Sequence, residues 1–242
     1  MQKILIILLL LLVIYISYNK YYIDNFDIIK REGLIYTDSD IIYKIYKMIY
    51  IVDRILNIYN IDYWMEGGTL LGALRHQGII PWDEDADIQI LDKDEYKLEE
   101  LKPIFNKFGY SMDKTWWGYK IYPSDGIIIK DFNWKYPGLD IFVAEIFKDD
   151  DIKLRYKYPQ AQERFSKCFS YYKDIYPLKR YKFGSFEING PNNPYTYLNS
   201  CYGNDWYDIA YMEYNHEKEI PYEKNKIFLT DFDRIPALPF YP

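Results

Sequence analysis

The chain has 242 residues, of which 49% are hydrophobic and 27% charged, and its formal net charge is −6. This length supports one domain with a sizeable core and is marginal for two, and the composition excludes disordered, collagen-like and coiled-coil classes. The acidic balance, with no run of Lys and Arg beside interleaved aromatic residues, argues against a nucleic-acid partner. Two cysteines, Cys168 and Cys201, are too few for a four-ligand zinc site, so they form either one disulfide or two buried thiols.

An unbroken apolar run from Ile4 to Ile16 stands near the N-terminus. As a helix it is shorter than the roughly 30 Å hydrocarbon core of a bilayer, but tyrosines extend it to residue 23, about 20 residues in all. No small-residue cleavage site follows. We therefore expect residues 1–23 to be a transmembrane signal anchor rather than a cleaved signal peptide. This makes the protein a single-pass membrane protein, with a lumenal or extracellular body as the working assumption, because basic residues flank the run on both sides.

The rest of the chain, residues 24–242, has the pattern of one α/β domain without internal repeats or linkers. Helical spacing of apolar residues predicts helices, and alternating or β-branched runs predict strands. The expected helices are 37–60, 69–76 and 92–108, the last disturbed at Pro103. The expected strands are 61–65, 86–91, 117–122, 126–131 and 139–147.

A glycine pair, Gly67 and Gly68, connects the strand at 61–65 to a helix that we expect to open at Thr69. Glycine lets the backbone approach an anion closely, and the free N–H groups of a first helical turn point toward it. Thr69 can cap the helix or donate to a phosphate oxygen. By itself this pattern predicts only a turn with a cap.

Three aspartates spaced by two, Asp83, Asp85 and Asp87, lead into the apolar strand at 86–91. Side chains at i and i+2 of a strand share a face, so Asp85 and Asp87 are expected to converge. Adjacent carboxylates repel each other unless a cation neutralises them, and hard divalent ions prefer carboxylate oxygen. An EF-hand is excluded, because Ile88 occupies the position that requires Gly and Asp94 the position that requires Glu.

A metal site for phosphoryl transfer needs a further acid from a neighbouring strand. Asp140, at the start of the apolar strand 139–147, is the best candidate, and Asp131 is the fallback. The alternative for Asp140 is a residue at the start of a strand that faces water.

The run YWMEGGTLLGALRH (Tyr63 to His76), followed by GIIPWDEDAD (Gly78 to Asp87), resembles the signature of the LicD family. That family includes bacterial phosphocholine transferases and the fukutin proteins, which act on glycans. Asp140 fits the family's later strand, and residues 191–206 resemble its C-terminal pattern. The resemblance implies a nucleotidyltransferase-like fold, a mixed sheet flanked by helices.

The resemblance also implies roles for two groups of residues. Those expected to contact the phosphates of a donor are Gly67, Gly68, Thr69, Arg75 and His76. Those expected to hold Mg²⁺ or Mn²⁺ are Asp83, Asp85, Asp87 and Asp140, and Asp85, Asp87 and Asp140 are the expected catalytic residues. Two roles stay open: His76 is either a ligand contact or a buried histidine, and Asp140 is either a metal ligand or the base that takes the acceptor's proton.

The expected activity is metal-dependent transfer of a phospho-alcohol, such as a phosphocholine- or ribitol-phosphate-like group. The donor would be a nucleotide diphosphate of the cytidine type, and the acceptor a glycan. One alternative is a type II membrane glycosyltransferase with an Asp-x-Asp motif, although few residues precede Asp83 for its nucleotide-binding units. The other is a glycan-binding pseudoenzyme. Because the chain has too few cysteines for the zinc insertion of fukutin-related protein, the acceptor is not inferred from that relative.

Overall fold

The computed structural model describes residues 12–15, 31–147 and 152–242. The chain divides into two compact units, Met1–Tyr36 and Thr37–Pro242, which we describe separately. In the first unit, residues 12–15 are helical and their side chains are exposed. Apart from these four residues, the predicted anchor at 1–23 lies outside the described part of the chain. Among the helices that are described, none has the length and apolar character needed to cross a membrane.

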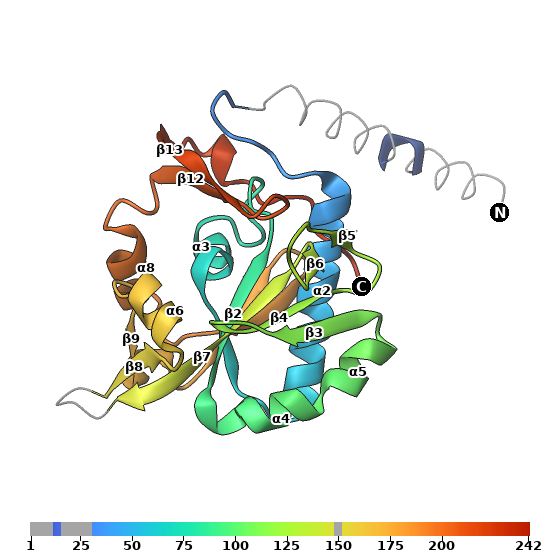
Figure 1. Cartoon of the computed structure of the whole chain (residues 1–242). Helices are drawn as coiled ribbons and strands as arrows, with labels where there is room; N and C mark the ends of the chain where they lie inside the picture. The colour runs from blue at the N-terminus through green and yellow to red at the C-terminus, as the bar shows by residue number, and fades with distance from the viewer. Residues whose placement is uncertain (1–11, 16–30, 148–151) are drawn as a thin grey trace, which may run out of the picture. The chain divides into compact units, whose positions relative to one another are not determined.

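The second unit is built on a mixed sheet, which over the described residues has seven strands (Figure 1). Its main path runs in the order β1-β2-β7-β4-β3, and β8 and β9 extend it from β7. The strands are β1 (Tyr63–Met65), β2 (Ala86–Leu91), β3 (Tyr110–Lys114), β4 (Gly118–Pro123), β7 (Leu139–Phe147), β8 (Lys153–Tyr156) and β9 (Ser170–Tyr171). The neighbours β2 and β7 are parallel, and the other pairs are antiparallel. The expected mixed α/β architecture is therefore confirmed.

The register of the central strands places three charged residues side by side. Asp87 of β2 is the partner of Asp140 on β7, and Asp140 is also the partner of Lys120 on β4. The first six residues of β7 are buried, which is typical of a strand in the middle of a sheet. The sheet thus carries a row of charged side chains across its buried centre.

Helices cover the sheet and connect its strands. Helix α2 (Ser39–Ile58) begins after Asp38, whose carboxylate accepts the N–H of Asp40, and it buries one apolar face near β7 and β11. Helix α3 (Gly67–Arg75) packs on β2. Figure 1 shows α6 and α8 beside the β8–β9 end of the sheet, and α5 near β3. The other helices are α4 (Glu95–Glu100), α5 (Lys102–Lys107), α6 (Pro159–Arg164), α7 (Tyr172–Ile175) and α8 (Tyr195–Tyr202), with one-turn 3-10 helices at Asp92–Asp94 and Phe232–Arg234.

Outside the large sheet, three short hairpins complete the described elements. They are β5 (Ile127–Ile128) with β6 (Lys135–Tyr136), β10 (Lys179–Phe183) with β11 (Phe186–Gly190), and β12 (Ile209–Asn215) with β13 (Ile220–Phe228). The strand expected at 126–131 is only two residues long, because it pairs with nothing but the equally short β6. The single helix expected at 92–108 is instead a 3-10 turn, α4 and α5, with Pro103 in the first turn of α5, where its missing N–H has no cost.

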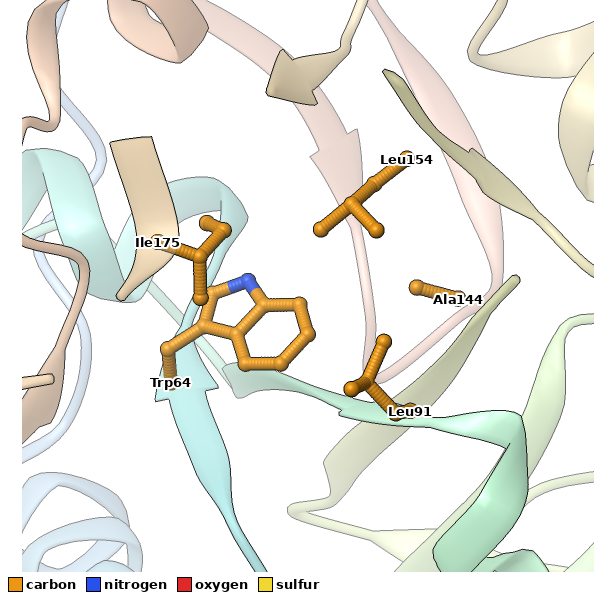
Figure 2. Close-up of a cluster of buried hydrophobic side chains, with 5 residues drawn as sticks. All are labelled: Trp64, Leu91, Ala144, Leu154 and Ile175. Atoms are coloured by element: carbon orange, nitrogen blue, oxygen red, sulfur yellow. The ribbon is translucent and has the colours of Figure 1, made fainter. Parts of the chain in front are cut away.

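The apolar cluster in Figure 2 joins the β1 edge of the sheet to the segment that follows β9. Its five members come from four strands and from α7, and each is at most 3% exposed: Trp64, Leu91, Ala144, Leu154 and Ile175. Burying a large apolar side chain contributes about 1.5–3 kcal/mol. This cluster therefore stabilises β1, which leads directly into the glycine turn.

The two cysteines form a disulfide between Cys168 and Cys201. This resolves the choice between one disulfide and two thiols that the sequence left open. The bond ties the segment before β9 to the last turn of α8.

Candidate active site

A cavity of about 560 Å³ lies over the carboxyl-rich start of β2. Residues of the glycine turn, of β4, β7 and α8, and of the β12–β13 hairpin line it. Among the lining residues are Gly67, Gly68, Arg75 and all four predicted acids, Asp83, Asp85, Asp87 and Asp140. Thr69 and His76 do not line it.

Three of the acids converge in this cavity. One oxygen atom from each of Asp85, Asp87 and Asp140 lies within 4.8 Å of the other two. Asp87 and Asp140 meet because the parallel strands β2 and β7 align them, and Asp85 immediately precedes β2. The distance between the acids is therefore set by sheet register.

These carboxylates destabilise one another's charge. Burial, followed by repulsion from Asp85, Asp140 and Asp83, raises the pKa of Asp87 well above its usual value. Burial raises the pKa of Asp85 to about 6. Burial, together with repulsion from Asp85, raises the pKa of Asp140 to about 6 as well. Burial and Asp85 likewise raise the pKa of Asp83 well above its usual value. A set of carboxylate oxygens with unbalanced negative charge matches what a hard divalent cation binds.

The glycine turn lies against the acids. A side chain at Gly67, whose φ is +54°, would contact Oδ2 of Asp87, and a Cβ at Gly68 would lie 2.5 Å from Oδ2 of Asp83. The N–H of Gly68 donates to Oδ2 of Asp87 at 3.2 Å, and the N–H of Gly67 donates to the hydroxyl of Tyr197, also at 3.2 Å. Glycine is therefore needed at 67 and 68 to leave room for the carboxylates of Asp83 and Asp87.

Thr69 acts on the backbone of the acid strand. Its Oγ1 accepts the N–H of Asp87 at 2.7 Å, and the side chain is buried. In this structure, therefore, the residue expected to contact phosphate positions the start of β2 and does not reach the cavity. Helix α3 begins at Gly67 rather than at Thr69.

Arg75 and His76 lie at the end of α3. The Nη1 of Arg75 donates to the carbonyl oxygens of Trp206 and Ile209 at 2.7 and 2.9 Å, so it connects α3 to the start of β12 while lining the cavity. His76 is 2% exposed, and its Nε2 lies 3.0 Å from the carbonyl oxygen of Asp233. Burial and the adjacent Arg75 lower the pKa of His76 to about 3. Of the two roles left open for His76, its placement favours the buried, hydrogen-bonded histidine.

Lys120 of β4 is a cavity residue that the sequence analysis missed. Its Nζ lies 2.9 Å from Oδ1 and 3.2 Å from Oδ2 of Asp140, and it is 4% exposed. Burial lowers the pKa of Lys120, but the carboxylates of Asp140 and Asp85 outweigh burial and raise it overall. A lone charged residue in the otherwise apolar and aromatic run of β4 was the available signal.

His216, in the turn between β12 and β13, was also missed. Its Nδ1 lies 3.2 Å from Oδ2 of Asp85, and its backbone N–H donates to Oε2 of Glu84 at 2.7 Å. Burial and the charge of Lys120 lower the pKa of His216 to about 4, so the imidazole is neutral near pH 7. Because His216 lies 132 residues from Glu84, no local pattern connects it to the acids that precede β2.

Glu66, the third missed residue, is buried at the start of α3. The hydroxyl of Tyr156 donates to its Oε1, and its Oε2 has no partner among the described residues. Burial raises the pKa of Glu66 to about 8, so this carboxyl is protonated near neutral pH. When this carboxyl ionises, its charge adds to the repulsion that raises the pKa of Asp87.

Comparisons with known proteins connect this site to a family. Residues 60–193 match the family model described as LicD/FKTN/FKRP, nucleotidyltransferase domain. The chain is 37% identical to the uncharacterized protein RP689 of Rickettsia prowazekii, over 82% of this chain and 70% of that protein. It is 29% identical to the ribitol 5-phosphate transferase FKRP of Mus musculus, over 62% of this chain and 33% of the mouse protein.

A short, denser match is with the lipopolysaccharide cholinephosphotransferase LicD of Haemophilus influenzae, 54% identical over 39 residues, or 16% of this chain and 14% of that protein. Among solved structures, the lincosamide antibiotic adenylyltransferase LnuA is similar with a TM-score of 0.37 and 16% identity, over 60% of this chain and 78% of that one. The alignments with FKRP and LicD thus span a third or less of those proteins. Since the family model covers more than half of the residues and includes the glycine turn and the four acids, the chain belongs to the LicD family.

Proposed function

We propose that this protein is a metal-dependent phosphotransferase that moves a phospho-alcohol from a nucleotide-diphosphate donor to a glycan hydroxyl. The observation that carries the proposal is the cluster of Asp85, Asp87 and Asp140, in which Asp87 is partly exposed and the other two are buried, in a cavity shared with the glycine turn. Membership of the LicD family supports it, because two relatives are named for transferring ribitol 5-phosphate and choline phosphate. The phospho-alcohol class and the cytidine-type donor rest on this relationship.

The acid cluster is suited to hold Mg²⁺ or Mn²⁺. Asp85, Asp87 and Asp140 would supply its ligands, with Asp83 beside them, since their convergent carboxylates lack enough positive charge around them. A divalent ion bound there would neutralise the phosphate charge that grows as the bond to the leaving nucleotide breaks.

The protein's own side chains set the geometry around this cluster. His216 contacts Asp85 and Lys120 contacts Asp140, so two of the acids are oriented from outside the cluster. A cavity of about 560 Å³ has the size of a small-molecule site, and residues of β4 and of the β12–β13 hairpin line it. Asp140 is placed to hold the ion or to take the proton of the acceptor hydroxyl, and the proposal covers both roles.

The apolar run at residues 4–16 supports a further part of the proposal, membrane attachment through residues 1–23. We expect alkaline carbonate not to extract the full chain from membranes. Quantitative release by carbonate would contradict attachment without affecting the proposed chemistry.

The test is a donor screen that measures release of the mononucleotide. Purified protein is incubated with Mg²⁺ or Mn²⁺ and with cytidine-diphosphate choline, cytidine-diphosphate ribitol or uridine-diphosphate sugars. We expect release of cytidine monophosphate from at least one cytidine-diphosphate alcohol, and its loss when the metal is chelated. Turnover of nucleotide-sugars alone would indicate a glycosyltransferase, and binding without any turnover a glycan-binding pseudoenzyme.

Matched variants locate the activity in the acid cluster. The double variant Asp85→Asn, Asp87→Asn should lose activity by on the order of 1,000-fold and keep its fold, because charge stabilisation of the transition state is removed. The control is Asp125→Asn, the same chemical change at an exposed acid outside the cavity. Full activity in the double variant would disprove the proposed site.

A further inference from the structure

The ammonium of Lys120 lies beside the acid cluster, at a position whose surroundings favour a cation. It comes from β4, opposite Asp140 of β7, and its Nζ is within hydrogen-bond distance of both oxygens of that carboxylate, at 2.9 and 3.2 Å. The side chain is 4% exposed, yet it lines the cavity. A charged ammonium is rarely buried unless it is paired, so this placement needs a reason.

The side chain of Lys120 lies against a glycine and two aromatic rings. A Cβ at Gly138 would contact Cε of Lys120 and lie 3.1 Å from its Nζ, so a side chain at 138 would displace the end of the lysine. The rings of Trp117 and Trp134 have their centroids 5.5 and 5.8 Å from the ammonium, within the range of a cation–π contact. Carboxylate, glycine and two aromatic rings therefore define one position for the ammonium.

This ammonium lies where a second metal ion would share a ligand. Two-ion phosphoryl-transfer sites place their cations about 3.5–4 Å apart, bridged by carboxylates. In this cluster Asp140 is the acid supplied by the neighbouring strand β7, and both of its oxygens already contact Lys120. One ion held by Asp85, Asp87 and Asp140 is compatible with that arrangement, because a carboxylate can contact an ion and an ammonium at once, but a second ion on Asp140 would have to displace the ammonium.

Resting on the proposed function, we propose that Lys120 takes the place of a second divalent cation. It is a positioning residue: it holds Asp140 and supplies a fixed positive charge beside the donor phosphates. The acid cluster consequently binds one divalent ion per chain.

The first test counts bound ions and needs no turnover. Isothermal titration of the full chain with Mn²⁺ should give one equivalent for the wild type. Lys120→Met should give two equivalents, because the place of the ammonium beside Asp140 is then free for a second ion. The matched control is Lys114→Met on the adjacent strand β3, where the lysine contacts Glu95 and Glu99 outside the cavity and the count should stay at one.

The second test displaces Lys120 without removing it. Gly138→Ala adds a Cβ in the path of the lysine, so it should lower kcat in the same direction as Lys120→Met, for which we expect a loss on the order of 100-fold. Lys120→Arg keeps the charge and should recover part of the loss. Circular dichroism verifies that each variant folds. If Lys120→Met does not fold, the kcat values of Gly138→Ala and Lys120→Arg still test the role of the ammonium.

The outcomes separate this inference from the proposed function. Two equivalents of Mn²⁺ in the wild type would overturn the role of Lys120 while leaving the metal-dependent phosphotransferase intact. No bound ion in the wild type would overturn both. An unchanged count and unchanged kcat in Lys120→Met would overturn the inference alone.

Discussion

Glu95 and the cavity acids are buried or partly buried carboxylates whose pKa values the protein shifts in opposite directions. Glu95, the first residue of α4, accepts hydrogen bonds from the ammonium of Lys157 at 2.5 Å, from the hydroxyl of Tyr158 at 2.5 Å and from the hydroxyl of Tyr119 at 2.9 Å. Burial raises its pKa, but these three donors outweigh burial and lower the pKa to about 2. Its charge is fully compensated from within the protein.

The cavity acids have fewer compensating partners. Lys120 contacts Asp140 and His216 contacts Asp85. After burial, the largest effects on the pKa of Asp87 come from other acids. A buried charge without a partner costs stability, and sites that retain one are characteristically functional. The contrast indicates that Glu95 stabilises the fold, and it supports the proposal that a bound cation completes the cluster around Asp87.

The largest expected effect is on the stability of the folded protein, which two substitutions should change in opposite directions. Glu95→Gln should destabilise the protein by about 2–3 kcal/mol, because an amide replaces the charge that three buried donors require. Asp87→Asn should stabilise the metal-free protein by about 1–2 kcal/mol, because it removes repulsion, and should abolish activity. Urea denaturation with a chelator present measures both values.

Activity completes the comparison between the two variants. Glu95→Gln, outside the cavity, should keep kcat within about twofold at a temperature where it is folded. If Asp87→Asn destabilised the metal-free protein as much as Glu95→Gln does, the two carboxylates would both be structural and the contrast would fail.

The sequence predicted the acid half of the site better than its surroundings. The strands at 86–91 and 139–147 were predicted with their observed bounds, because β-favouring residues and turn residues mark both, and the acids sit at their starts. Placing Asp140 beside Asp87 requires that the two strands be both neighbouring and parallel. The parallel register that aligns them is visible only in the structure.

Lys120 and His216 were missed for a different reason. Their roles depend on pairing between distant segments: β4 aligns Lys120 with Asp140, and a hairpin beyond the family model delivers His216 to Asp85. Thr69 shows the converse. The local pattern correctly placed it by a helix start, but only the fold shows that its hydroxyl accepts the N–H of Asp87.

A smaller effect, about 1–2 kcal/mol, is expected in the pH dependence of stability. The folded-state pKa of Asp87 is raised, so its contribution to stability is present below the unfolded pKa, about 3.8, and is lost as the pH rises through the folded pKa. The advantage of Asp87→Asn over the metal-free wild type should therefore be near zero at pH 3.5 and should grow toward pH 7.

Glu95 should show the opposite sign over a lower range of pH. Its folded-state pKa is lowered to about 2, so its stabilisation is present above the unfolded pKa, 4.5, and is lost as the pH falls through about 2. The deficit of Glu95→Gln should thus be full at pH 6 and shrink toward pH 2. Denaturation curves at several pH values check both, and a Glu95→Gln deficit that did not change with pH would contradict the charge-based explanation.

The smallest effect expected is stabilisation by the divalent ion itself. At a concentration ten times its dissociation constant, Mn²⁺ should add about 1.4 kcal/mol, or a rise of about 3–6 °C in Tm for a chain of this size. Because the ion completes the charge balance of the acid cluster, Asp87→Asn should lose most of this rise, while Glu95→Gln should show all of it from a lower starting Tm. Thermal unfolding followed by circular dichroism measures the shift. An equal rise in both variants would place the ion elsewhere, and the cavity acids would then lack the ligand that their unbalanced charge predicts.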